Sequence, residues 1–473
     1  MKRRDFINSG LIAALSGAVA TPLIATGCSS AISEAKKGVA KNIIFLVSDG
    51  MSTGTLNMGD LLKQRMLGKS STWLQLYREN KAKHALVDTA SLDSLVTDSA
   101  AGSSAWGGGV RVNNGSLNTA PDGTKHKPIL QKFKASGKKV GCVTTVPITH
   151  ATPAGFCVNM KSRQSQDKIA DEYLKLKFDV MMGAGLEYFD GSKRKDKKNI
   201  LSDFTHQDFQ VIKTKAEMAN LQSDQPVLGL FSKSEMPYAL DHSADKTLMD
   251  EKPSLAEMTE KAIALMQDNP QGFVLQVEGG KVDWAAHGND AAALLYDQMA
   301  FDDAVEVAIK FAESRNDTLV IITTDHGNSN PGLIKCKNVD AKFDLLQNVK
   351  HTNEWILFGI KPNDKATKVI DRIHHAQGYA ITTAEAQHIL KSYASLESDG
   401  LYNAYKLPFK DLAKIQENYT AIHWSGMNHS ADFVELAMYG AGSEDLPPFI
   451  KNTDLHNYML DAAGIAMAQT KVS

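Results

Sequence analysis

Short apolar runs, rich in β-branched residues, are spread along the chain at residues 42–47, 139–145, 273–277 and 318–323. Each run is almost continuously hydrophobic rather than alternating, which is typical of strands that are covered on both faces. Amphipathic stretches with helical spacing separate the runs. Together they predict an α/β fold with a large, mostly parallel sheet and helices on both sides, which is a three-layer α/β/α sandwich.

One amphipathic stretch carries its own boundary signals. Ser254 is followed three residues later by Glu257, the pattern of a capping box. The helical spacing continues to about Gln267, and Asn269-Pro270 then ends it. We therefore expect a helix here, directly before the apolar run at residues 273–277.

The pattern changes in the last third of the chain. Between residues 331 and 424 the strong apolar runs disappear and the sequence becomes polar and helical. This predicts a core made of residues 41–330 and 425–473, with residues 331–424 inserted as a separate subdomain.

The first residues have the features of an export signal. A basic start with paired arginines, which resembles a twin-arginine signal, precedes about 16 mostly apolar residues, too few to span a bilayer. The segment ends in Ala25-Thr-Gly-Cys28, which resembles a lipoprotein cleavage site. We expect export to the periplasm, removal of residues 1–27, a lipid anchor on Cys28 in the cell-envelope membrane, and a linker at residues 28–40. The alternative is an ordinary cleaved signal peptide with an incidental cysteine.

Composition narrows the function classes. The 473 residues include 52 basic and 54 acidic side chains, so the formal charge is −2 and nucleic acid is not an expected partner. Four cysteines are too few for a disulfide framework. Without Cys28, the remaining Cys142, Cys157 and Cys336 allow at most one disulfide, so stability must come from the core or from bound metals.

Carboxylates, imidazoles and a hydroxyl follow the apolar runs closely. In a parallel sheet the carboxyl ends of the strands lie at one edge, where α/β folds place their sites. A cluster of buried charges would be costly unless it coordinates cations. The residues that follow the four runs in this way are Asp49, His150, Thr152, Glu278, Asp325 and His326.

The spacing and chemistry of these side chains indicate two kinds of metal ion. Asp283 and His287 are four residues apart, so on a helix both can hold one ion. Asp325 and His326 are adjacent at a strand end and, with Asp49, can hold a second ion. Mixed nitrogen and carboxylate ligands suit zinc, whereas the oxygen donors Glu278 and Thr152 suit magnesium.

A candidate nucleophile lies in the segment Thr97-Asp-Ser99-Ala-Ala101. A serine at the start of a helix lies beside free backbone N–H groups, which favour an anion. The same segment also has the sequence of an ordinary helix N-cap. The metal cluster favours the nucleophile interpretation.

These motifs resemble the alkaline phosphatase family over nearly all of the chain after the signal. The resemblance rests on segments that occur in the family's order: Val47-Ser-Asp49-Gly-Met51, Thr97-Asp-Ser99-Ala-Ala101, His150-Ala-Thr-Pro-Ala-Gly-Phe156 followed by Arg163, Val277-Glu-Gly-Gly-Lys-Val-Asp-Trp-Ala-Ala-His-Gly-Asn289, Thr324-Asp-His326 and a final His429 before a strand. It implies a homodimer and a hydrolase that releases inorganic phosphate from varied small monoesters. The insertion at residues 331–424 is expected to form a crown-like subdomain, and its role in dimer contacts or substrate access is left open.

The resemblance also implies a role for each residue. Ser99 would be phosphorylated and Arg163 would bind the phosphate, a task that suits a planar bidentate donor. Two zinc ions and one magnesium ion would be bound, with Asp49 shared between two of them. The implied ligands are Asp283, His287 and His429 for the first zinc, Asp49, Asp325 and His326 for the second, and Asp49, Thr152 and Glu278 for magnesium.

The chain departs from the family pattern at two positions near the phosphate. His150 and Trp284 stand where other members carry an Asp and a Lys. We expect weaker magnesium retention, looser phosphate binding and faster product release. His423 is a rival to His429 as a zinc ligand, and His429 is preferred because it leads directly into a strand pattern.

Two other functions are compatible with parts of the pattern. A related phosphodiesterase or sulfatase would share the metal ligands, but sulfatases use another nucleophile motif and diesterases usually lack an arginine placed like Arg163. A phosphate-binding or metal-binding lipoprotein without activity would have no need of Ser99.

Overall fold

The structure, a computed structural model, describes residues 39–222, 225–394, 396 and 406–465. The predicted export signal and Cys28 therefore lie outside the described residues. Among the helices that are described, none is long and apolar enough to cross a membrane.

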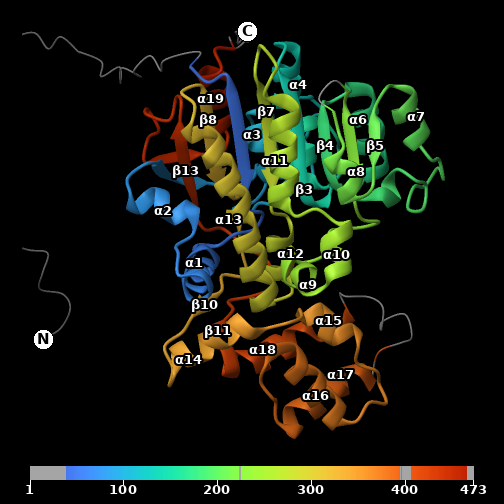
Figure 1. Cartoon of the computed structure of the whole chain (residues 1–473), viewed down its shortest axis with the longest axis vertical. Coiled ribbons are helices and arrows are strands. Elements are labelled where there is room, and N and C mark those ends of the chain that lie inside the picture. The colour runs from blue at the N-terminus through green and yellow to red at the C-terminus, as the bar shows by residue number, and fades with distance from the viewer. Residues whose placement is uncertain (1–38, 223–224, 395, 397–405, 466–473) are drawn as a thin grey trace, which may run out of the picture. The chain divides into compact units, whose positions relative to one another are not determined.

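A ten-stranded sheet forms the centre of the fold (Figure 1). Every neighbouring pair of strands is parallel, except that β13 runs antiparallel to β2 and β8. In spatial order the strands are β14 (Phe449–Lys451), β2 (Lys83–Asp88), β13 (Val434–Gly440), β8 (Thr318–Thr323), β1 (Asn42–Val47), β7 (Phe273–Glu278), β3 (Lys139–Pro147), β4 (Val180–Ala184), β6 (Val227–Leu230) and β5 (Gln210–Ile212).

The apolar runs form the middle of this sheet, as predicted. Strands β1 and β8 have the predicted bounds, β3 continues to Pro147, and β7 continues to Glu278. The predicted capping box is also present, because Ser254 and Glu257 cap each other at the start of α11 (Leu255–Met266). The α/β fold with a large, mostly parallel sheet is thus confirmed.

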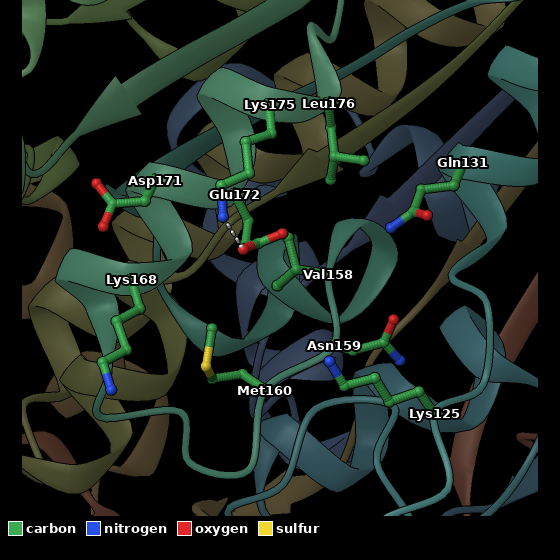
Figure 2. Close-up of a pocket in the computed structure, with 10 residues that line it drawn as sticks. All are labelled: Lys125, Gln131, Val158, Asn159, Met160, Lys168, Asp171, Glu172, Lys175 and Leu176. Atoms are coloured by element: carbon green, nitrogen blue, oxygen red, sulfur yellow. Dashed lines mark hydrogen bonds and ion pairs between the residues drawn. The ribbon is translucent and has the colours of Figure 1, made fainter.

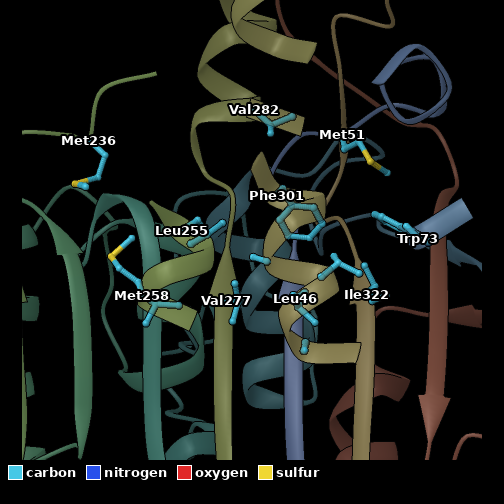
Figure 3. Packing of buried hydrophobic residues seen from close by; sticks show 14 of the residues in the cluster. Leu46, Met51, Trp73, Met236, Leu255, Met258, Val277, Val282, Phe301 and Ile322 are labelled. Atoms are coloured by element: carbon cyan, nitrogen blue, oxygen red, sulfur yellow. The ribbon is translucent and has the colours of Figure 1, made fainter. Parts of the chain in front are cut away.

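Both faces of the sheet are buried under helices, and β1 shows how. Its alternate side chains enter two separate hydrophobic clusters, with Ile44 and Leu46 in one and Ile43 and Phe45 in the other. Figure 3 shows Leu46 packed among residues of β7, β8, α11 and α13 in the first cluster. On the other face, the Phe45 ring lies 5.1 Å from the ring of Trp106 on α3. Full burial of a side chain of this kind stabilises the fold by roughly 2 kcal/mol.

Each helix is assigned to one face of the sheet by the hydrophobic cluster to which its buried side chains belong. The first face is covered by α1 (Thr53–Leu67), α2 (Thr72–Arg78), α8 (Lys215–Ala219), α9 (Ala239–Ala244), α11, α12 (Lys281–His287) and α13 (Ala291–Glu313). The second is covered by α3 (Ser99–Gly108), α4 (Ile129–Ala135), α5 (Ala151–Cys157), α6 (Gln166–Leu176), α7 (Leu201–His206) and α19 (Asp454–Ala462). The short elements α10 (Lys246–Glu251) and η1 (Leu186–Tyr188) complete the part of the chain before residue 327.

The described residues between 339 and 420 are mostly helical, and they include a hydrophobic cluster of their own with members from Ile356 to Ile415. Two short ribbons connect this region to the core: β10 (Gly332–Leu333) pairs with β11 (Ile422–His423), and β9 (Gly327–Asn328) pairs with β12 (His429–Ser430). Other residues of this region, Phe343, Leu346 and Val349, pack in the first cluster of the core, so a separate subdomain at residues 331–424 stays a prediction. Its helices are α14 (Val339–Asp344), η2 (Leu345–Asn348), α15 (Asn353–Phe358), α16 (Ala366–Gln377), α17 (Thr383–Ala394) and α18 (Phe409–Thr420).

The register of the central strands sets the position of the site. Val47 of β1 lies opposite both Glu278 of β7 and Thr323 of β8, and Glu278 lies opposite Thr144 of β3. The segments that follow these four strands therefore begin at one level of the same sheet edge.

Candidate active site

Ser99 is the first residue of α3 and lies in the interior of the site. The carboxylate of Asp98, the N-cap residue, accepts a hydrogen bond from the Ala101 amide at 2.9 Å, which fixes the start of the helix. The Ser99 side chain is buried, and its Oγ lies 3.2 Å from Nε2 of His326. The predicted nucleophile thus contacts one of the predicted metal ligands.

Helix α3 is held close to α5, which carries Thr152. A Cβ atom on Gly107 of α3 would lie 2.0 Å from the carbonyl oxygen of Gly155 in α5, so no larger residue fits there. Asn118 links the two helices: its amide N–H donates to Oγ of Ser104, and its side chain donates to the Gly155 carbonyl at 2.7 Å. The position of Ser99 relative to Thr152 is therefore fixed by main-chain packing.

The first potential metal group consists of Asp283, His287 and His429. Asp283 and His287 lie one turn apart on α12, as predicted, and their nearest oxygen and nitrogen are 3.4 Å apart. His429, on β12, places Nε2 within 3.6 Å of the Asp283 carboxylate and within 3.0 Å of Nε2 of His287.

The imidazoles of this group are oriented as ligands. Nδ1 of His287 donates to the Met427 carbonyl at 2.7 Å, and Nδ1 of His429 donates to the Thr97 carbonyl at 2.9 Å. In the neutral rings both Nε2 atoms are then acceptors, and two acceptors 3.0 Å apart repel each other. A cation bound by both nitrogens would remove this repulsion.

The second group consists of Asp49, Asp325 and His326, all fully buried. Nε2 of His326 lies 3.5 Å from the Asp49 carboxylate and 3.4 Å from the Asp325 carboxylate. Nδ1 of His326 donates to the Gly327 carbonyl, so in the neutral ring Nε2, which faces the Ser99 hydroxyl, is an acceptor that can bind a cation.

The third group surrounds the opposite side of Asp49. The Thr152 hydroxyl donates to Asp49 at 3.3 Å, and Glu278 accepts a hydrogen bond from the Thr144 hydroxyl at 2.5 Å. His150, with Asp49 and Glu278, could also provide a ligand atom to this group. Asp49 therefore contributes to two groups, as the resemblance implies.

The chemistry of these side chains fits bound cations. One carboxylate oxygen of each of Asp49, Glu278 and Asp325 is buried and has no hydrogen-bond partner among the described residues. Burial and the neighbouring carboxylates raise the pKa of Asp49, and burial raises the pKa of Glu278 to about 8. Unpartnered buried oxygens that repel one another are stabilised by divalent cations, which their ligand chemistry suits.

The predicted phosphate-binding residues form a chain beside Ser99. Arg163 donates from Nη1 to the Asp98 carboxylate at 3.0 Å and from Nη2 to Nε2 of His150 at 3.0 Å. The Trp284 ring lies 6.1 Å from the His150 ring, edge-on. Burial, together with the Arg163 charge, lowers the pKa of His150 to about 3, so this imidazole is neutral at physiological pH.

Several positioning contacts were not predicted from the sequence. Asn328 donates from its side chain to Asp283 at 2.7 Å. Burial acts to raise the pKa of Asp283, but the charges of the neighbouring His287, His326 and His429, and then this hydrogen bond, lower it to about 2. Gly50 has a φ of +66°, and a Cβ there would lie 2.4 Å from the Asp283 carboxylate. Neither residue could be predicted as part of a metal site from the sequence. Both act only by contacting Asp283, which is distant from them in the chain.

His423 does not join the metal groups. It lies on β11, where its Nδ1 is 3.1 Å from the Glu417 carboxylate, and its side chain is 41% exposed. A surface depression of about 430 Å³ beside α6 also lies apart from the site, with Lys125, Lys168, Lys175, Asp171 and Glu172 in its wall (Figure 2).

We expect the metal-free protein to lose stability as the pH rises through neutrality. A carboxyl group with a raised folded-state pKa stabilises the fold below its unfolded pKa, and this contribution is lost as the pH rises through the folded pKa. For Glu278 the pH range in which stability falls extends from its ordinary pKa of 4.5 to its raised pKa of about 8. Between about pH 6.5 and 8 the free energy of unfolding should therefore fall by roughly 2 kcal/mol.

The control is the same protein loaded with metal. Bound cations keep the ligand carboxylates, including Glu278, ionised over the whole pH range, so their contribution to the free energy of unfolding no longer falls as the pH rises. Asp290 and Asp297, whose pKa values burial raises to about 7, titrate in both forms. The difference in Tm between the loaded and chelator-treated protein should widen across this range, and a constant difference would contradict the prediction.

Comparisons with known proteins cover nearly the whole described chain. The family model for alkaline phosphatase matches residues 40–465. The chain is 32% identical over 429 residues to alkaline phosphatase 4 of Bacillus subtilis, covering 89% of this chain and 88% of that protein. It is 28% identical to the repressible alkaline phosphatase of Saccharomyces cerevisiae, covering 84% of this chain and 76% of that one. The crystal structure of alkaline phosphatase from Thermus thermophilus superposes with a TM-score of 0.83 and 29% identity, covering 94% of this chain and 96% of that one.

Proposed function

Because the chain belongs to the alkaline phosphatase family and hydrolyses phosphate monoesters, we propose that it acts through a phosphoserine at Ser99, with two zinc ions and one magnesium ion. The observation that carries the proposal is the contact of 3.2 Å between the Ser99 hydroxyl and His326, which belongs to a fully buried group of metal-ligating side chains. A nucleophile in this position can be activated by a cation without any other general base.

The ligand types divide the three groups between the two metals. We assign the groups that contain His287 with His429 and that contain His326 to zinc. We assign the group that contains the oxygen donors Thr152 and Glu278 to magnesium, although His150 lies close enough to offer it a nitrogen. The first zinc group is Asp283, His287 and His429, the second is Asp49, Asp325 and His326, and the magnesium group is Asp49, Thr152 and Glu278.

The residues around Ser99 support an in-line displacement. When bound, the cations would lower the pKa of the hydroxyl and neutralise charge on the attacking and leaving oxygens. The Ser99 oxygen attacks phosphorus and the alcohol leaves; a water molecule then attacks the phosphoserine and releases phosphate and free Ser99. Two displacements give net retention at phosphorus.

Arg163 is the proposed ligand of the non-bridging phosphate oxygens. Its guanidinium is anchored by Asp98, whose pKa is lowered by the Arg163 charge and by backbone hydrogen bonds although burial acts to raise it. The anchor aligns the planar donor next to the start of α3, where the free amides also favour an anion. A lysine could not make both contacts.

A direct test compares three substrates. The metal-loaded protein should hydrolyse p-nitrophenyl phosphate much faster than bis-p-nitrophenyl phosphate or p-nitrophenyl sulfate. Preference for the diester would indicate the related phosphodiesterase activity, and preference for the sulfate would indicate a sulfatase. Either result would overturn the proposal.

We expect Trp284→Lys to strengthen product inhibition. Trp284 is neutral and lies beside His150, and an ammonium in its place would add a charge-assisted contact to phosphate. The inhibition constant for phosphate should fall about tenfold, equivalent to roughly 1.4 kcal/mol, with a lower kcat if release limits turnover. Trp284→Leu is the matched control, and unchanged phosphate inhibition in the lysine variant would count against the assignment.

Export and anchoring are part of the proposal. We place the protein in the periplasm or on the cell-envelope membrane, with lipid on Cys28, on the strength of the basic start and the Ala25-Thr-Gly-Cys28 segment. The mass of the mature N-terminal peptide distinguishes a lipidated Cys28 from an ordinary cleaved signal.

A second copy of the chain is the partner we propose for the sheet edge at β14. Leu86 of β2 lies in register with Phe449 of β14, and the Phe433 ring is 5.0 Å from that of Phe449. The exposed fractions are 41% for Leu86, 48% for Phe449 and 53% for Phe433. Among the described residues β14 is the last strand at this edge of the sheet, where a strand of another chain can pair. The proposed assembly is a homodimer.

We expect Phe433→Asp to dissociate this dimer. A carboxylate in an apolar contact would be desolvated without a partner, which weakens association by at least about tenfold. Sedimentation velocity measures the change. Phe358→Asp, at an exposed phenylalanine of α15, is the control; a Phe433→Asp variant that stays dimeric would contradict the assignment.

A further inference from the structure

Two buried thiols lie directly behind the proposed magnesium site. Cys142 belongs to β3, Cys157 is the last residue of α5, and their Sγ atoms are 3.7 Å apart. Both side chains are fully buried. The proposed mechanism uses neither thiol.

We propose that Cys142 and Cys157 are a modification site: in the oxidised protein they form a disulfide bond that fixes α5 to the central sheet. A disulfide has an S–S distance of about 2.05 Å, so the sulfur atoms need to approach by about 1.7 Å. The two residues already face each other across the contact between β3 and α5, so side-chain rotation provides the movement.

The oxidation is a thiol–disulfide exchange. Two S–H bonds break and one S–S bond forms, with the loss of two protons and two electrons from the protein. A disulfide-containing oxidant, such as glutathione disulfide, accepts them and becomes two thiols.

The folded protein protects the pair from this reaction. Burial, and then the adjacent Cys157 thiol, raise the pKa of Cys142, and thiol–disulfide exchange requires the thiolate. Val158 and Gln131 line the depression in Figure 2, and the Gln131 side chain donates to the Cys157 carbonyl at 2.8 Å. We therefore expect the bond to form while the chain folds and to resist reduction afterwards.

The pair is connected to the proposed magnesium site through Gln276. The Cys142 thiol donates to the Gln276 side chain at 3.2 Å, and that side chain donates to the Thr152 carbonyl at 3.1 Å. Thr152 is on α5, the helix that the disulfide would fasten. The covalent bond would restrain the helix that carries Thr152 when the metals are removed.

The bond should raise thermal stability. It closes a loop between residues 142 and 157, and a loop of this size reduces the conformational entropy of the unfolded chain. A loop of about 15 residues is worth about 3 kcal/mol, so we expect the oxidised, metal-free protein to unfold about 3 °C above its reduced form.

Peptide mapping tests the proposal independently of catalysis. The full chain is denatured, reduced and refolded either with glutathione disulfide or with a reducing agent, then alkylated in denaturant and digested with trypsin. Both cysteines fall in the peptide between Lys139 and Lys161, whereas Cys336 falls in another. In the oxidised sample the first peptide should carry no alkyl group and weigh two hydrogens less than the unalkylated dithiol, whereas in the reduced sample it should carry two alkyl groups. Cys336 should be alkylated in both samples.

The outcomes separate cleanly. Free thiols at both positions in protein that has refolded in the oxidising buffer would overturn the proposal, and so would a disulfide that includes Cys336. Cys142→Ser should abolish the difference in Tm between the two samples, and Cys336→Ser should leave it unchanged. Cys157→Ser provides a second test if Cys142→Ser does not fold. Because the readouts are peptide mass and Tm, loss of phosphatase activity would not affect the result.

Discussion

Ser99→Ala should lower kcat/KM for phosphate monoesters by roughly three to six orders of magnitude, because it removes the attacking oxygen and leaves only binding and charge stabilisation. The metals should remain bound, because Ser99 contacts His326 but belongs to none of the three ligand groups. The α3 start should also remain intact, since Asp98 caps it independently. Steady-state rates and metal analysis of the same sample measure both expectations.

Ser103→Ala is the matched control. Ser103 is a buried serine one turn further along α3, and its hydroxyl donates to main-chain carbonyls of Ala100 and Ala151. We expect a Tm loss of a few degrees and activity within several-fold of the unmodified protein. Equal activity losses in the two variants would show that Ser99 acts through packing.

Asp49→Asn should affect two metal groups at once. Asp49 is fully buried between them, and an amide offers one neutral oxygen where the carboxylate offers two charged ones. We expect the loss of at least one bound metal ion per chain and a fall in kcat/KM of at least about 1000-fold. Metal analysis by mass spectrometry and steady-state kinetics measure these effects.

The same variant should change stability in opposite directions with and without metal. In the metal-free protein, burial and repulsion from Asp325, Asp283 and Glu278 raise the pKa of Asp49. A side chain that cannot carry a negative charge removes this repulsion, so the substitution should raise Tm. In the metal-loaded protein, weaker metal binding should lower Tm. Asp60→Asn, at a buried carboxylate that accepts from Arg78 and Ser71, should lower Tm in both forms and leave the metals in place. A Tm loss in both forms of Asp49→Asn would contradict the electrostatic account.

The sequence was most informative where one local pattern determines the structure. The continuous apolar runs of β1 and β8 could be located to the residue because both faces of these strands are buried. The spacing of Asp283 and His287 likewise placed both side chains on one turn of α12. Strand ends then brought Asp49, Glu278 and Asp325 to one edge.

Contacts that depend on distant segments were harder to predict. His429 approaches His287 because β12 pairs with β9, and nothing in the local sequence of either two-residue strand specifies that register. Asn328 orients Asp283 from the same ribbon. The contact between Cys142 and Cys157 also arises from the packing of α5 on β3 and has no local signal.

The central claim is a covalent bond between phosphate and Ser99. The metal-loaded protein is mixed with a phosphate monoester at mildly acidic pH, quenched in acid and digested with trypsin. The peptide between Lys83 and Arg111 contains Ser99 together with Ser91, Ser94, Ser103 and Ser104, so fragmentation is needed to locate the phosphate. A single phosphate on Ser99, absent from Ser99→Ala, is the predicted result; an unmodified peptide, or phosphate on another residue, would contradict the account.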